Sequence, residues 1–309
     1  MAVVNTNISA SLAQASLARN ERALSKAMEQ LSTGKKINTA ADDAAGLAIS
    51  TRMSSQIIGL EQSVQNASDA ISMIQTAESA LDEITNMLLR MRELALQASN
   101  GTGSVADRNY LQDEFTRLRE EIDRIANNTE WNGRAVLNGN AGGSGVQTVS
   151  FQVGGNAGQT ISVDFGYMVG GGLANNGVSG GPTAASGGLA LQPSDAQNSA
   201  LLPPVAISGA TTVLAQQNAS AAMTGIDRAI ENVSNQRASF GATVNQLTHS
   251  IDNLTQVSIN AESTRSRIMD TDYARSTSEL AKAQIIQQAG TAMLAQANQL
   301  PASVLDLLK

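Results

Sequence analysis

The sequence contains no cysteine, one histidine and very few aromatic residues. Without cysteine the chain can form no disulfide bond and offers no thiol nucleophile, and one histidine cannot supply the ligand set of a zinc site. Aromatic residues make up 3% of the 309 residues, although 42% are hydrophobic. Large globular cores normally depend on aromatic rings for buried area, so this composition argues against one large core.

The chain also lacks an excess of positive charge and long apolar runs. Lysine and arginine total 20, against 27 aspartate and glutamate residues, which gives a formal net charge of -7. Sequence-independent binding of nucleic acid needs a basic surface, so we expect no nucleic-acid partner. No stretch reaches the roughly 18 apolar residues that span a membrane, so we expect no membrane insertion. The first charge is Arg19 and no charged segment precedes an apolar run, so we expect no cleaved secretory leader.

Glycine and proline divide the chain into three zones. Of 26 glycines, 16 lie between Gly139 and Gly188, and four of the five prolines lie between Pro182 and Pro204. The flanks on either side are rich in alanine and in charge. Because glycine and proline break helices while alanine favours them, the pattern predicts a helical flank, a non-helical insert and a second helical flank.

Apolar residues in both flanks recur at alternating spacings of three and four. One row begins at Leu60 and is interrupted only by Glu78, and the other begins at Met223 and includes Arg237. This spacing, sustained over several heptads, is typical of helices packed as a coiled coil. As one helix, residues 43–99 would be about 85 Å long, so we expect a mainly α fold built as a long antiparallel coiled-coil rod. The predicted core residues are Leu60, Val64, Ile71, Ile74, Leu81, Leu88, Leu118, Ile122, Ile230, Phe240, Val244, Leu247, Ile251 and Leu254.

Short motifs mark the ends of the predicted helices. Thr39 with Asp42 resembles a capping box that opens the long helix, and Asn100 followed by glycine is a stop signal. Ser104 with Asp107 has the pattern of the next helix start.

The middle of the chain has the pattern of short strands. Apolar and polar residues alternate over 149–153 and again over 161–165, with a glycine-rich turn between them, which predicts a β-hairpin. Upstream, the sequence Trp-Asn-Gly at 131–133 predicts a turn. Residues 166–212 show no usable periodicity, so we expect a small, glycine-rich insert of loops and β-structure.

Both ends of the chain, residues 1–33 and 272–309, are amphipathic. Two helices formed by these ends can pair with each other, but the pair would still leave apolar surface exposed. We therefore expect a self-assembling protein whose ends are buried only in the assembly. The apolar residues are Ile8, Leu12, Leu17, Leu24, Met28 and Leu31 at the first end and Leu280, Ile285, Ile286, Met293, Leu294, Leu300, Val304, Leu305, Leu307 and Leu308 at the second.

Residues that could support catalysis are scarce. The single histidine, His249, lies between the heptad positions Leu247 and Ile251, so we expect it to face solvent or the rim of the coiled coil. The sequence has no nucleophile elbow, no phosphate-binding loop and no zinc-protease helix motif. We expect no enzyme activity, no cofactor and no metal.

Five longer motifs lie outside the segment 166–212. They are INTAADDAAGLAIS at 37–50, MRELALQASNGT at 91–102, EIDRIANNTEWNGRAVLNG at 121–139, FQVGGNAGQTISV at 151–163 and the stretch 266–309. Together, and in this order, they resemble the bacterial flagellin family, and the resemblance covers roughly 1–165 and 215–309. It implies a structural subunit of the flagellar filament. The alternative is a hook–filament junction protein of the same family, which usually departs from the middle motifs EWNG and FQVGGNAGQTISV.

The resemblance also implies an arrangement of five segments. They are an N-terminal inner-tube helix with its connector (1–42), the N-terminal part of the rod domain (43–165), a variable surface-exposed insert (166–212), a C-terminal rod helix (213–265) and a C-terminal inner-tube helix (266–309).

The partners and the location follow from the same resemblance. It implies a helical homopolymer outside the cell, reached by unfolded export through the flagellar type III apparatus. An export chaperone is expected at the C-terminal segment, and cap and junction proteins are expected at the filament ends. Recognition by an animal Toll-like receptor is also implied, at Arg90, Leu94 and Glu114 with Arg92, Glu93 and Gln97 nearby.

Overall fold

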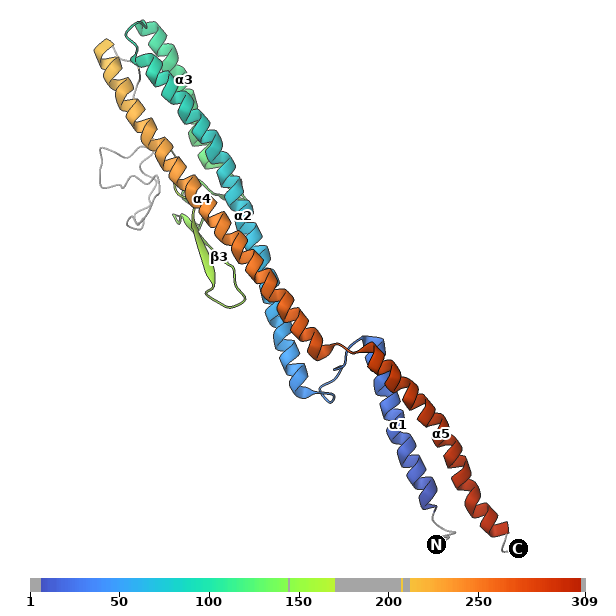
Figure 1. Cartoon of the computed structure of the whole chain (residues 1–309). Coiled ribbons are helices and arrows are strands. Elements are labelled where there is room, and N and C mark those ends of the chain that lie inside the picture. Colours follow the sequence, from blue (N-terminus) through green and yellow to red (C-terminus); the bar gives the residue numbers. More distant parts are fainter. Residues whose placement is uncertain (1–6, 144, 170–206, 208–211, 307–309) are drawn as a thin grey trace. The chain divides into compact units, whose positions relative to one another are not determined.

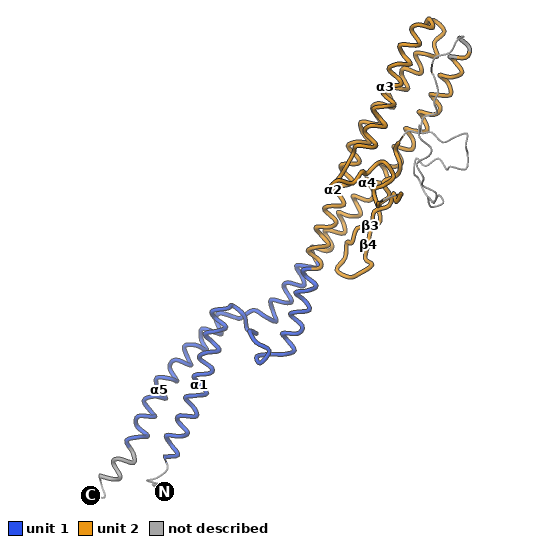
Figure 2. The backbone as a smooth tube through the Cα atoms, turned by 180° about the vertical axis from the view of Figure 1, so that it is seen from behind, with its two compact units in different colours: residues 1–58, 257–309 blue, residues 59–256 orange. Residues whose placement is uncertain are grey.

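The computed structural model describes residues 7–143, 145–169, 207 and 212–306, and these residues are mainly helical, as predicted (Figure 1). The chain divides into two compact units, residues 1–58 with 257–309 and residues 59–256 (Figure 2). The helices are α1 (Ile8–Thr33), α2 (Ala44–Ser99), α3 (Val105–Asn128), α4 (Thr212–Met269) and α5 (Tyr273–Asp306), and the strands are β1 (Glu130–Trp131), β2 (Arg134–Ala135), β3 (Thr148–Gln152) and β4 (Thr160–Asp164).

The unit of residues 59–256 has an apolar core between α2, α3 and α4. Leu81 and Leu88 of α2 lie in the same core as Phe240 and Leu247 of α4, and all four are at most 1% exposed. Of the predicted core residues, those that are buried are Leu60, Ile74, Leu81, Leu88, Ile122, Phe240 and Leu247. Those that are half-buried are Val64, Ile71, Leu118, Ile230, Val244, Ile251 and Leu254.

Two polar residues within the apolar rows meet across α2 and α4. Arg237 Nε lies 2.9 Å from Glu78 Oε1, and Arg237 Nη2 lies 3.1 Å from Asp82 Oδ1. The hydrogen bond to Glu78 raises the pKa of the guanidinium. Farther along, Arg92 Nε lies 2.7 Å from Asp227 Oδ1. These pairs join two antiparallel helices, as predicted, and paired charges at a seam specify one register.

The start of α3 is the predicted capping box. The Ser104 hydroxyl accepts a hydrogen bond from the backbone N–H of Asp107 at 3.2 Å, and Asp107 Oδ2 accepts one from the backbone N–H of Ser104 at 3.0 Å. The Ser104 side chain and backbone hold the pKa of Asp107 below its ordinary value. Phe115 and Ile122 follow on the buried side of α3, at 3% and 0% exposed.

The start of α2 differs from the prediction. The helix begins at Ala44, and Asp43 Oδ1 accepts a hydrogen bond from the backbone N–H of Gly46 at 2.9 Å. Asp42 Oδ2 instead accepts from the backbone N–H and the hydroxyl of Thr39, at 3.0 Å and 3.1 Å. The capping box assigned to Thr39 and Asp42 is therefore wrong, because that pair closes the turn before the helix while the next aspartate caps it.

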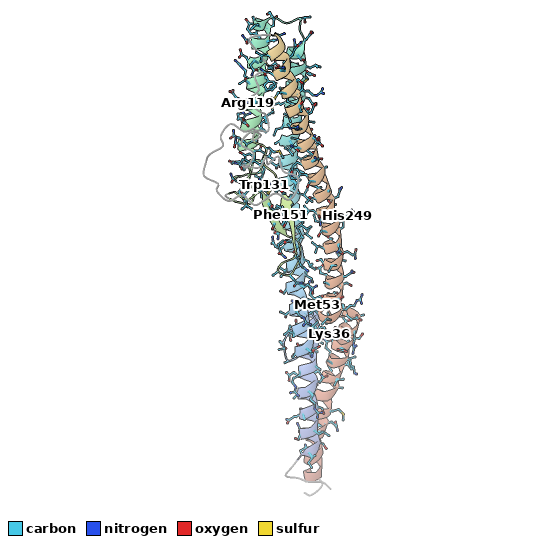
Figure 3. The ribbon with its side chains drawn as sticks, turned by 90° about the vertical axis from the view of Figure 1, so that its left-hand side faces the viewer. Lys36, Met53, Arg119, Trp131, Phe151 and His249 are labelled. Atoms are coloured by element: carbon cyan, nitrogen blue, oxygen red, sulfur yellow. The ribbon has the colours of Figure 1, made fainter. Side chains whose placement is uncertain are left out.

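Two β-hairpins follow α3 in the sequence. β1 pairs with β2 through a turn in which Asn132 and Gly133 have φ angles of 52° and 74°. Asparagine and glycine are the residues that best tolerate this left-handed conformation. β3 pairs antiparallel with β4, which confirms the predicted hairpin, and Figure 3 shows Trp131 and Phe151 of the two hairpins beside the helices.

The second hairpin is held to α2 and α4 by its two ends. The Phe165 ring, just after β4, lies 5.4 Å from the Phe240 ring, measured between centroids. Gln236 of α4 donates a hydrogen bond to the Asp164 carbonyl at 2.7 Å, and Asn66 of α2 donates one to the Gln152 carbonyl at 3.0 Å. The hairpin therefore contributes to the core of this unit.

Most of the predicted insert, at 170–206 and 208–211, lies outside the described residues. Ile207 is described, and it is fully buried in the core of the unit. Its backbone N–H donates a hydrogen bond to Gln112 Oε1 on α3 at 2.6 Å. The sequence did not predict that a residue of the insert belongs to the core.

Candidate functional site

The helices α1 and α5 form an antiparallel pair within the unit of residues 1–58 and 257–309 (Figure 1). Small residues let the two backbones approach closely. A side chain on Gly290 of α5 would place its Cβ 3.1 Å from Leu17 Cδ1 on α1, which is tighter than ordinary van der Waals contact. The buried apolar residues of the two helices are Ala10, Ala27, Ala283 and Ala297.

Two asparagines fix the register of this pair. Asn7 donates from Nδ2 to the Ala297 carbonyl at 2.9 Å, and Asn20 donates from Nδ2 to the Ala283 carbonyl at 2.7 Å. Asn7 also caps α1, because its Oδ1 accepts the backbone N–H of Ala10 at 3.0 Å. No motif in the sequence marked these asparagines. Asn20 could have been identified from its spacing, because it stands three residues after Leu17 and so lies on the seam side of the helix.

The last part of α1 is tied to the segments that precede α5 and α2. Gly34 ends α1 in the left-handed conformation, with φ 70°, and its carbonyl accepts the backbone N–H of Thr271 at 3.0 Å. Lys26 Nζ lies 2.7 Å from Asp42 Oδ1, and this bond holds the pKa of the Asp42 carboxyl well below its usual range. The first contact joins the end of α1 to the residues before α5, and the second joins α1 to the turn before α2.

The pair leaves large apolar side chains exposed on the sides away from the seam. Ile8 and Leu12 stand two residues before and after the seam residue Ala10, and Ile285 stands two residues after Ala283. Two residues are about 200° of helix rotation, so these side chains lie on the outer sides of the pair. We call the exposed residues the terminal apolar set: Ile8 (68% exposed), Leu12 (63%), Met28 (54%), Ile285 (66%), Ile286 (45%) and Met293 (66%).

The predicted terminal residues thus divide between two surfaces. Leu24, Leu31 and Leu294 are half-buried, whereas Ile8, Leu12 and Ile285 are exposed. Leu300 and Val304 belong to α5, but their side chains are outside the described part of the chain, and so is all of Leu307.

Charge is missing from most of α5. From Ala283 to Leu305 the helix carries no lysine, arginine, aspartate or glutamate. A helix that is apolar on two sides and uncharged over most of its length is normally buried on more than one side. The α1–α5 pair therefore has the apolar, uncharged composition that is typical of a protein–protein interface.

Among the residues assigned to receptor recognition, the structure brings some together and buries one. Arg90 on α2 donates from Nε to Glu114 on α3 at 2.9 Å and from Nη1 to Glu93 at 3.0 Å. The hydrogen bonds to Glu93 and Glu114 raise the pKa of Arg90. Gln97 is exposed on the same helix. Leu94 is 1% exposed and lies in the apolar core, where α2 packs against both α3 and α4.

The described residues offer little for catalysis or for metal binding. His249 is exposed on α4 (Figure 3). Among the described residues no cluster of three histidine or acidic side chains could hold a metal ion. Across the same part of the chain, every helix is too short or too polar to cross a membrane.

Long helices that pack antiparallel, with small hairpins between them, place the chain in the class of mainly helical proteins. Residues 4–141 match the bacterial flagellin N-terminal helical region, and residues 223–308 match the bacterial flagellin C-terminal helical region. The chain belongs to the bacterial flagellin family.

Two curated relatives show that the similarity extends over the whole chain. A flagellin of Halalkalibacterium halodurans is 40% identical over 313 residues, covering 99% of this chain and 100% of the relative. Flagellin A of Vibrio anguillarum is 37% identical over 383 residues, covering 99% of both chains. The chain is therefore a flagellar filament subunit, a structural protein of the extracellular flagellum and not an enzyme.

Solved structures add the fold alone. A structure titled as a flagellar hook-associated protein of Vibrio parahaemolyticus matches with a TM-score of 0.51 at 16% identity, covering 74% of this chain and all of that one. At this identity the likeness carries no argument for the junction-protein alternative, whereas the full-length relatives are named flagellins.

Proposed function

We propose that the α1–α5 pair is the surface through which subunits contact one another in the filament. The observation that carries the proposal is the terminal apolar set, which is 45% to 68% exposed on the isolated chain. The uncharged stretch of α5 supports it, because an exposed helix in water normally carries charge.

The free energy gained by burying these side chains is of the size expected for a contact between subunits of a polymer. Burying a large apolar side chain that is half exposed contributes roughly 1 kcal/mol. The terminal apolar set would therefore contribute several kcal/mol for each subunit added, which is the order needed to offset the loss of free rotation and translation on association. A contact of this kind is repeated at every subunit.

The test is removal of both ends. A chain without residues 1–33 and 272–309 keeps the core between α2, α3 and α4. We expect it to retain helical circular dichroism and cooperative unfolding but to form no filaments by electron microscopy. Normal filaments from the trimmed chain would contradict the proposal.

The segments and the remaining partners are proposed on the family resemblance. We assign 1–42 and 266–309 to the inner tube, 43–165 and 213–265 to the rod, and 166–212 to the outer surface. We assign the C-terminal segment to an export chaperone, because exposed Ile285 and Met293 would otherwise favour premature association before type III export. Cap and junction proteins would meet the filament ends.

We propose second that an animal Toll-like receptor recognises this chain at Arg90, Leu94 and Glu114. The charged cluster of Arg90, Glu93 and Glu114 supports it, with Arg92 and Gln97 exposed on the same helix. Arginine offers a planar fork of donors that suits an interface anchor.

The test of recognition is a reporter-cell titration with monomer and with intact filament. We expect the monomer to activate the Toll-like receptor. The Arg90→Ala substitution should weaken recognition of the monomer roughly thirtyfold. Full potency of the Arg90→Ala monomer would assign this cluster to helix packing alone.

A further inference from the structure

Among the described residues, the exposed methionines lie on the α1–α5 pair. Met28 of α1 is 54% exposed and Met293 of α5 is 66% exposed. In the core of the other unit, Met73, Met91 and Met168 are at most 2% exposed. The remaining described methionines are half-buried: Met53, Met87, Met223 and Met269.

We propose that the thioethers of Met28 and Met293 are an oxidation site that blocks addition of the subunit to the filament, an inference that rests on the proposed role of the α1–α5 pair. Methionine is oxidised according to how far an oxidant can reach its sulfur. The chain contains no cysteine, so no faster-reacting thiol competes for the oxidant.

The oxidant is hydrogen peroxide, and the reaction is a two-electron transfer of oxygen. The methionine sulfur attacks one peroxide oxygen, the S–O bond forms and the O–O bond breaks. The departing hydroxide takes the proton left on the transferred oxygen and leaves as water. The thioether is oxidised to a sulfoxide while the peroxide is reduced.

The sulfoxide changes the surface that assembly must bury. Met28 and Met293 belong to the terminal apolar set, which consists otherwise of isoleucine and leucine. A sulfoxide is polar, and burying it among apolar side chains without a hydrogen-bond donor is unfavourable. Two sulfoxides should raise the monomer concentration needed for seeded growth by more than about tenfold.

The same geometry predicts that assembled subunits resist oxidation. Peroxide must reach the sulfur, and a neighbouring subunit that covers Met28 and Met293 removes this access. Monomer and filament should therefore differ at these two positions, while Met73 and Met91 in the core should react slowly in both states.

The experiment treats full-length monomer and preformed filaments with graded hydrogen peroxide. Peptide mass spectrometry then measures the gain of one oxygen at each methionine, and seeded elongation is followed by light scattering. We expect Met28 and Met293 to react first in the monomer and to be protected in the filament. We also expect elongation to fall in step with their oxidation and to recover after treatment with methionine sulfoxide reductases of both stereospecificities.

Two double variants identify the responsible sulfurs. For each variant, the elongation rate before peroxide treatment is compared with the rate after it. The variant that combines Met28→Leu with Met293→Leu should elongate equally before and after treatment. The matched control, Met53→Leu with Met223→Leu, should lose elongation on treatment as the unmodified chain does.

The outcomes separate this inference from the proposed function. Untreated full-length monomer that fails to elongate seeds contradicts the assembly role itself. Untreated monomer that elongates, and elongates equally with both sulfoxides present, overturns the oxidation site alone. Loss of elongation in the peroxide-treated Met28→Leu and Met293→Leu variant would also overturn it, because the sensitive group would then lie elsewhere.

Discussion

Single residues decide how the helices of this chain align. Glu78 and Arg237 each interrupt an apolar row, yet they meet at 2.9 Å across α2 and α4. Asn7 and Asn20 have the same role in the α1–α5 pair, where each donates to a carbonyl of the opposite helix. A polar residue without its partner would be costly in a seam, so other registers are disfavoured.

The seam between α2 and α4 predicts a sharp contrast between two neighbouring positions. Leu247 is fully buried, whereas His249, two residues later, is exposed. Leu247→Asp should lower the free energy of unfolding by about 3 kcal/mol or more, because a carboxylate enters an apolar core. His249→Ala should change it by less than about 0.5 kcal/mol. Urea titration of both variants measures this, and a larger loss at His249 would mean that the assigned register is wrong.

Most of the helices and strands could be predicted from the periodicity of apolar residues in the sequence. The spacing of apolar residues predicted the long helices, and alternation predicted the pairing of β3 with β4. The cap of α2 was misassigned because Asp42 and Asp43 are adjacent acceptors, and only the backbone geometry decides between them. Leu94 lies beside the predicted row and is buried because α2 packs there against two helices, which widens its apolar face.

The candidate site was predicted less completely than the fold. The apolar ends were visible in the sequence, but the division between the seam and the exposed sides depends on how α1 and α5 meet. Alanines and Gly290 set that contact, and such small residues give only a weak hydrophobic signal. Likewise, no periodic pattern connects Ile207 with Gln112, because their contact depends on tertiary structure alone.

Ile207 makes the end of the insert an element of the core. Ile207→Ala should destabilise the unit by about 2–5 kcal/mol, because a fully buried isoleucine leaves a cavity. Val146→Ala is the control, since Val146 is 48% exposed. Thermal unfolding of both variants measures the difference. A loss at Ile207 no greater than at Val146 would show that this contact does not support the core.

At the scale of the whole molecule, the chain contains one unit with a substantial core of its own and one helix pair whose apolar residues are only partly covered. The core between α2, α3 and α4 includes fully buried leucine, isoleucine, methionine and phenylalanine side chains. The fully buried apolar residues of the α1–α5 pair are alanines and its seam leucines are only half-buried, so the pair buries less apolar area. In the proposed function, assembly supplies the apolar contact that the pair lacks.

The most direct test of this account is seeded filament elongation by a variant of the terminal apolar set. Leu12→Asp combined with Ile285→Asp places charge on the outer sides of the pair, away from the seam, so the monomer should keep its helical circular dichroism. Val146→Asp is the matched control, because it adds a carboxylate at another exposed apolar residue outside the pair. We expect the double variant to add to seeds at least about a hundredfold more slowly, while the control elongates as the unmodified chain does. Elongation of the double variant at the unmodified rate would contradict it.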